Sequence, residues 1–174
     1  MSSKGEKQIK KPLDPDPIKR IEDEQAHMMA LCDMLETIAD EIPDNLNPST
    51  FVMAARSLRH ELPRLHRHEE QLLFPMLAKR AWPEDNIDEI LDGFRQENAM
   101  DEGYAEEVLT VLDRLSLGRG LENLEMAGYL LRGFFESLRR HLRWENIILL
   151  KLARQRLQED DLAQMSHQLS SESS

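Results

Sequence analysis

Apolar residues recur every three or four positions along four long stretches of the chain, and this spacing predicts four amphipathic helices. The stretches cover residues 17–40, 48–77, 86–115 and 123–157. The first two open with Asp16-Pro17 and Asn47-Pro48, a pairing that is typical of a helix cap followed by the first helical turn. A shorter stretch at residues 160–168 predicts a fifth helix.

The connections between these stretches are short, so consecutive helices are expected to run antiparallel. The pattern therefore predicts an all-α, up-down-up-down four-helix bundle with a short C-terminal helix. Pro63 interrupts the second stretch, and we expect it to kink that helix just before His66. The bundle domain covers residues 14–169, whereas the polar residues 1–13 and 170–174 lack the pattern and are expected to be disordered tails.

Side chains that can bind metals interrupt the middle of each apolar stripe. They are His27 in the first stripe, His66 and Glu70 in the second, Asn98, Asp101 and Glu102 in the third, and His141 and Glu145 in the fourth. In the second and fourth stripes the glutamate follows the histidine by four positions, which places both on one face of a helix. Imidazole and carboxylate without thiolate suit iron, manganese or zinc. The pattern predicts a metal site at mid-height in the bundle.

Each of these residues also has an ordinary interpretation as a hydrogen-bonded core residue, and for His27 alone that interpretation is favoured. Three stripe histidines and two glutamates four positions later favour a metal instead. His60, His68 and His167 are interpreted as ordinary side chains. His68 lies two positions from His66, so it is expected on roughly the opposite face of the helix.

The composition argues against nucleic-acid binding and against membrane association. The 33 acidic and 22 basic residues give a net charge of −11, the opposite of the usual balance in a nucleic-acid-binding protein. No apolar run approaches the roughly 20 residues that cross a bilayer, so we expect no membrane association and a cytoplasmic protein. The single cysteine, Cys32, excludes an intrachain disulfide, and its apolar neighbours favour a buried thiol.

The chain resembles the bacterial hemerythrin-like (HHE cation-binding) proteins over about residues 17–168. The matching segments are LPRLHRHEEQLLFP in the second stretch, ENAMDEGYAEEV in the third and RRHLRWENIILLKLARQRL in the fourth, with Glu24-x-x-His27 in the first. The resemblance implies a four-helix bundle around a non-haem di-iron site. It implies the ligands His27, His66, Glu70, His141 and Glu145, with the two glutamates bridging.

Two positions depart from the pattern of similar sequences. Asn98 stands where a histidine is usual, and Leu65 stands where many relatives have a second histidine. Glu102, four residues after Asn98, is therefore expected to act as the third-helix ligand. Three carboxylates among the metal ligands favour oxidation of the metal by oxygen or peroxide over reversible binding and release of oxygen.

The resemblance supports a metal-binding protein that interacts with O2, NO or peroxide in sensing, iron storage or oxidative protection. We expect two iron ions per chain, with manganese and zinc also compatible. One alternative is a ferroxidase or peroxide-consuming enzyme at the same site, although a binding protein is favoured over a dedicated enzyme. Another is a metal-free bundle that serves as an interaction module. Whether the chain forms a homodimer is left open.

Overall fold

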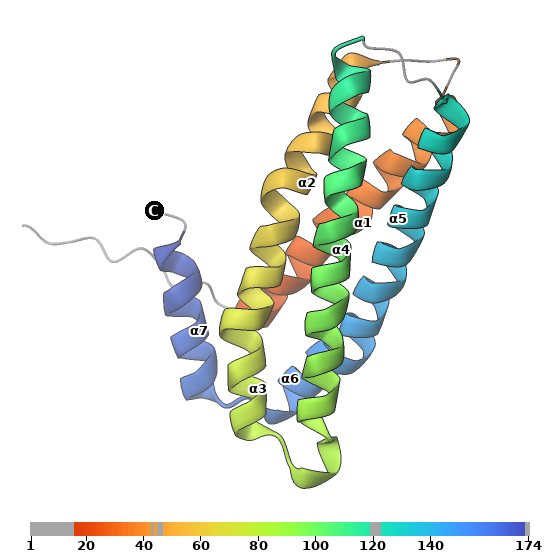
Figure 1. The fold of residues 1–174 in the computed structure, drawn as a ribbon. Coiled ribbons are helices and arrows are strands. Elements are labelled where there is room, and N and C mark those ends of the chain that lie inside the picture. Colours follow the sequence, from red (N-terminus) through yellow and green to blue (C-terminus); the bar gives the residue numbers. More distant parts are fainter. Residues whose placement is uncertain (1–15, 43, 45–46, 119–122, 173–174) are drawn as a thin grey trace, which may run out of the picture.

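The computed structural model describes residues 16–42, 44, 47–118 and 123–172, and every regular element within them is helical (Figure 1). The long helices are α1 (Pro17–Glu41), α2 (Pro48–His68), α4 (Ile87–Ser116) and α5 (Leu124–Trp144). The shorter elements are η1 (Glu69–Leu73), α3 (Phe74–Arg80), η2 (Pro83–Asp85), η3 (Glu145–Leu150), α6 (Lys151–Arg156) and α7 (Glu159–Ser171). The predicted N-terminal tail, residues 1–13, lies outside the described residues.

The predicted helix starts follow from side-chain caps. The Asp16 carboxylate accepts hydrogen bonds from the backbone N–H groups of Ile18 and Lys19, at 3.0 and 3.1 Å. The Asn47 side chain accepts one from the Ser49 N–H at 3.1 Å. Each cap satisfies backbone donors that have no partner inside the helix, and a proline follows it directly. The two proline-marked starts are confirmed.

The four long segments form the predicted up-down-up-down bundle (Figure 1). α1 packs against α2 and α5, and α4 packs against the same two helices from the other side. The apolar stripes meet in one core, whose largest fully buried side chains include Phe51, Phe74, Phe134, Ile21, Met28, Leu35 and Leu62. None of the helices in the described ranges is both long and apolar enough to span a bilayer.

Two of the predicted helices contain a wider turn that periodicity alone does not show. α2 continues into α3 through the π-helical η1, and α5 continues into α6 through the π-helical η3. Pro63 lies inside α2, and the departure from α-helical bonding begins six residues later, at Glu69. A π turn holds one more residue than an α turn, so it rotates the face on which the following side chains lie. Both π segments begin at a glutamate.

α7 packs against α1 and η1, outside the four-helix array (Figure 1). It covers His68, which is fully buried with its Nδ1 2.7 Å from Glu24 and its Nε2 2.9 Å from Glu172. The sequence interpreted His68 as an ordinary side chain on roughly the opposite face of the helix from His66, and the structure adds its burial and its two carboxylate contacts. This face of α2 is covered by α1 and by the C-terminal helix.

Cys32 is a free thiol with no exposed surface in the core of α1. Burial raises the pKa of this thiol to about 12, because the charged thiolate is poorly solvated there. The prediction of a buried, unreactive cysteine is confirmed.

Candidate metal centre

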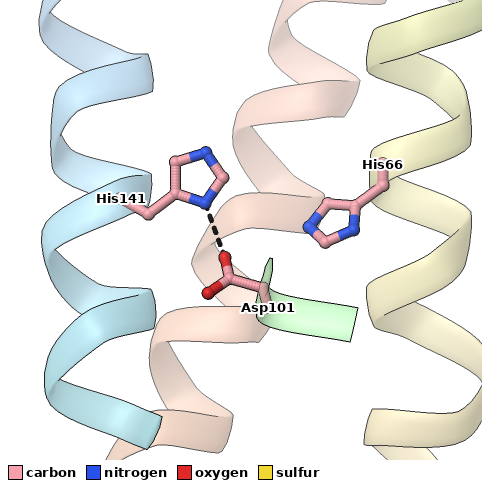
Figure 2. Close-up of side chains that lie close together, drawn as sticks. All are labelled: His66, Asp101 and His141. Atoms are coloured by element: carbon pink, nitrogen blue, oxygen red, sulfur yellow. Dashed lines mark hydrogen bonds and ion pairs between the residues drawn. The ribbon is translucent and has the colours of Figure 1, made fainter. Parts of the chain in front are cut away.

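His66 of α2 and His141 of α5 face each other inside the bundle, with ring centroids 6.3 Å apart. Asp101 of α4 lies between them (Figure 2). The exposed fractions of these three side chains are 2–3%. One potential ligand atom from each lies within 4.8 Å of the others. This buried cluster combines two imidazoles and a carboxylate from three helices.

Each histidine has its Nδ1 atom beside a carboxylate of α4. His141 Nδ1 lies 2.6 Å from Asp101 Oδ2, and His66 Nδ1 lies 3.0 Å from Glu102 Oε1. The Nε2 atoms of both rings are buried and have no hydrogen-bond partner among the described residues. A neutral imidazole that donates its Nδ1 proton to a carboxylate presents the Nε2 lone pair, which is the form that binds a metal.

His141 lies beside two carboxylates, those of Asp101 and Glu145. Its Nε2 lies 3.4 Å from Glu145 Oε1, and the Phe94 ring stacks on it at 5.8 Å between centroids. Burial lowers the pKa of His141, but the hydrogen bond to Asp101 and the close negative charges of Glu145 and Asp101 raise it, to about 10. A cation is therefore stabilised at this ring, and a metal ion binding there competes with a proton.

Gln25 of α1 joins two buried glutamates on the far side of the cluster. Its Nε2 lies 3.4 Å from Glu69 Oε1 and 3.2 Å from Glu145 Oε2, and both glutamates have no exposed surface. The other carboxylate oxygens, Glu69 Oε2 and Glu145 Oε1, are buried without a hydrogen-bond partner among the described residues. Burial, and then the charge of Glu145, raises the pKa of Glu69 well above its usual range.

Two surface grooves reach the centre from different sides. A groove of about 360 Å³ between α4 and the α5–η3 segment ends on His141, and Ile90, Gly93, Phe94, Trp144 and Ile148 form its apolar lining. A second groove of about 310 Å³, between α2 and α4, ends on His66, and its lining includes Arg67, Glu70, Arg95 and Glu102. The lining of the first groove is mostly apolar but also contains Glu89, Glu97 and Arg140, whereas the second groove is lined mainly by charged groups.

The structure brings together three of the six residues that the sequence proposed as ligands, namely His66, His141 and Glu145. Glu102 contacts His66, but its side chain is 48% exposed. Glu70 lies partly buried in the polar groove and accepts a hydrogen bond from Asn98 Nδ2 at 3.0 Å. His27 is exposed and lies outside the cluster. The roles of all six as ligands stay predictions.

Sequence reasoning missed Glu69 and Gln25. Glu69 precedes the buried Phe74 by five positions, just as Glu145 precedes the buried Leu150. In this register Glu69, not Glu70, corresponds to Glu145, and each begins a π segment. Aligning the two motifs on their apolar runs, and not on their histidines, would have shown this. Gln25 carries no comparable signal, because a single buried glutamine has no motif.

Comparison with curated proteins and with solved structures gave no match to this chain. The family model of the hemerythrin HHE cation-binding domain matches residues 16–153. This range contains all four long helices and every residue of the buried centre described above. The match agrees with the resemblance noted from the motifs, and it covers most of the chain. This chain belongs to the hemerythrin HHE cation-binding family.

Proposed function

We propose that this protein binds iron in the centre of the bundle and that the bound iron interacts with a small molecule such as O2, NO or peroxide. The observation that carries the proposal is the pair of buried histidines, His66 and His141. Each has its Nδ1 beside a carboxylate and its Nε2 buried without a hydrogen-bond partner among the described residues, although Nε2 of His141 lies 3.4 Å from Glu145 Oε1. Unpaired buried polar atoms are costly, and a metal ion would satisfy both.

The ligands proposed are the Nε2 atoms of His66 and His141 with the free oxygens of Glu69 and Glu145. Asp101 and Glu102 then orient the two imidazoles instead of binding the metal themselves, as carboxylates that accept the other ring N–H of a metal-bound histidine commonly do. This set of two nitrogens and two oxygens fits iron, with manganese and zinc as compatible ions. The family match to a cation-binding domain supports the same assignment.

A bound iron ion would supply redox and Lewis-acid chemistry toward the small molecule. The apolar groove offers a neutral molecule a route to the His141 side of the centre, and the Phe94 ring shields that side from water. The opposite groove carries Glu70 and Glu102 together with Arg67 and Arg95, so its charged lining is balanced. Two buried glutamates stabilise the higher charge of oxidised iron, so we propose oxidation of the iron over reversible release of oxygen.

Metal analysis and an absorption spectrum of anaerobically purified protein test the proposal. We expect iron in the wild-type protein and its loss in His141→Ala, with retention in His60→Ala. His60 is a suitable control because it is an exposed histidine of the same helix as His66. A wild-type protein that binds no iron, manganese or zinc would contradict the proposal. A stable oxygenated protein that returns its oxygen under vacuum would contradict the oxidation chemistry alone.

A further inference from the structure

We infer that the centre holds a single metal ion, and that Gln25 takes the place that a second ion would need. The inference rests on the proposed function, and it replaces the expectation of two iron ions per chain. It concerns the side of the centre that faces α1. Its evidence is the bonding of three buried side chains, Gln25, Glu69 and Glu145.

The amide nitrogen of Gln25 lies between the two carboxylates, at 3.4 Å from Glu69 Oε1 and 3.2 Å from Glu145 Oε2. A carboxylate oxygen accepts hydrogen bonds, and an amide NH2 group has two hydrogens to donate. In the structure the nitrogen of Gln25 faces both glutamates, and its oxygen is buried without a hydrogen-bond partner among the described residues. Gln25 is 3% exposed, so water does not compete for these contacts.

A carboxylate that bridges two metal ions uses one oxygen for each. In this centre one oxygen of Glu69 and one of Glu145 already accept a hydrogen bond from Gln25. The remaining oxygens are Glu69 Oε2 and Glu145 Oε1, and the latter lies 3.4 Å from His141 Nε2. Each glutamate therefore has one oxygen without a hydrogen bond, and the Gln25 nitrogen occupies the place between the other two oxygens, where a second ion would lie.

The Gln25 side of the centre also lacks an imidazole ligand. His27, two residues farther along α1, is exposed. His68 has both ring nitrogens beside carboxylates, those of Glu24 and Glu172. Leu65 is fully buried at the position of α2 that corresponds to His141 in α5. The amide nitrogen that faces the two glutamates has no lone pair available for a metal, so in this orientation Gln25 occupies the place of an ion on this side.

Metal stoichiometry after anaerobic loading with Co²⁺ tests this inference. We expect one tightly bound Co²⁺ per wild-type chain, measured by elemental analysis after gel filtration. Gln25→His combined with Leu65→His supplies the missing imidazoles, and we expect two ions per chain. Gln25→Leu should keep one ion, because the histidine side is unchanged. Gln155→His is the matched control: it adds a histidine at an exposed position of α6 and should leave the count at one.

Electron paramagnetic resonance of Co²⁺-loaded wild-type protein provides a measurement that does not depend on a variant's folding. An isolated high-spin Co²⁺ ion keeps its signal, whereas a coupled pair loses it. Two ions in the wild-type chain would overturn the inference and leave the proposed function intact. No bound ion at all would contradict the proposed function itself. A folded Gln25→His, Leu65→His variant that still binds one ion would overturn the role given to Gln25.

Discussion

Asp101 and Glu102 are adjacent in α4, yet their carboxylates contact histidines on two different helices, His141 of α5 and His66 of α2. Successive residues of an α-helix point about 100° apart, so neighbouring side chains can turn toward neighbouring helices. α4 packs between α2 and α5, and this position lets one short segment orient both imidazoles. In the proposed centre the third helix thus contributes orienting groups, whereas the sequence predicted Glu102 as a ligand.

Asp101→Asn should weaken metal binding by roughly 10- to 100-fold, the usual effect of losing an orienting carboxylate. The amide cannot stabilise the Nδ1 proton of His141 as a carboxylate does. Competition with a chelator of known affinity measures the change. Glu102→Gln should weaken metal binding less than Asp101→Asn, because the Glu102 side chain is 48% exposed and water can replace its contact with His66. Complete loss of metal in Asp101→Asn would instead make Asp101 a direct ligand.

Gly93→Leu should slow the approach of NO to the metal while leaving metal content unchanged. Gly93 lines the apolar groove, and a Cβ there would meet no atom within 4 Å, so the new side chain can enter the groove without a clash. Replacing a helical glycine also favours the helix by about 0.5–1 kcal/mol. Stopped-flow absorption measures the NO reaction, and thermal unfolding measures stability.

Gly103→Leu is the matched control for the groove. Gly103 lies in the same helix, also has open space around its Cβ position, and does not line either groove to the centre. Gly103→Leu should stabilise the helix without lowering the rate at which NO reacts at the metal. Equal rates in Gly93→Leu and wild-type protein would show that the molecule reaches the metal by another route.

His27→Ala should leave metal content unchanged and shift stability by no more than about 0.5 kcal/mol, as expected for an exposed side chain. The sequence placed His27 among the ligands, whereas in the structure the buried Gln25 is the residue of α1 that contacts the glutamates of the centre. Elemental analysis of the metal content of the purified variant decides whether His27 is a ligand. Loss of metal in His27→Ala would restore the sequence-based assignment.

Asp161→Asn should loosen α7 from the bundle. Arg80 donates two hydrogen bonds to the Asp161 carboxylate, at 2.7 and 3.2 Å, and Asp161 is 3% exposed. Removing a charged hydrogen-bonded partner at this site should cost about 2 kcal/mol. Hydrogen exchange across Glu159–Ser171 measures the docking. Asp160→Asn changes the exposed neighbour and should have little effect.

The same contact predicts an acid-sensitive helix. The hydrogen bond to Arg80 holds the pKa of Asp161 below its ordinary value of 3.8, although burial opposes the shift. A depressed pKa in the folded state means that the stabilisation is fully present above pH 3.8 and is lost as the pH falls through the folded-state value. Exchange in α7 should therefore increase at low pH in the wild-type protein more than in Asp161→Asn.

The sequence by itself determined the four long helices, their proline-marked starts and the mid-height position of His66, His141 and Glu145. These features depend on local properties: a repeat of 3.6 residues, side-chain caps and the low tolerance of a core for unpaired polar groups. The match of the two histidine-containing motifs to a known family rests on the same local pattern.

Only the tertiary structure decided which of two nearby polar residues faces the centre. Counting four positions from His66 selected Glu70, whereas Glu69, four positions after the buried Leu65, is the glutamate that contacts Gln25 in the centre. In α1, which packs against both α2 and α5, the buried Gln25 and not His27 contacts the carboxylates of Glu69 and Glu145. Side-chain partners come from other helices, and periodicity within one helix does not specify them.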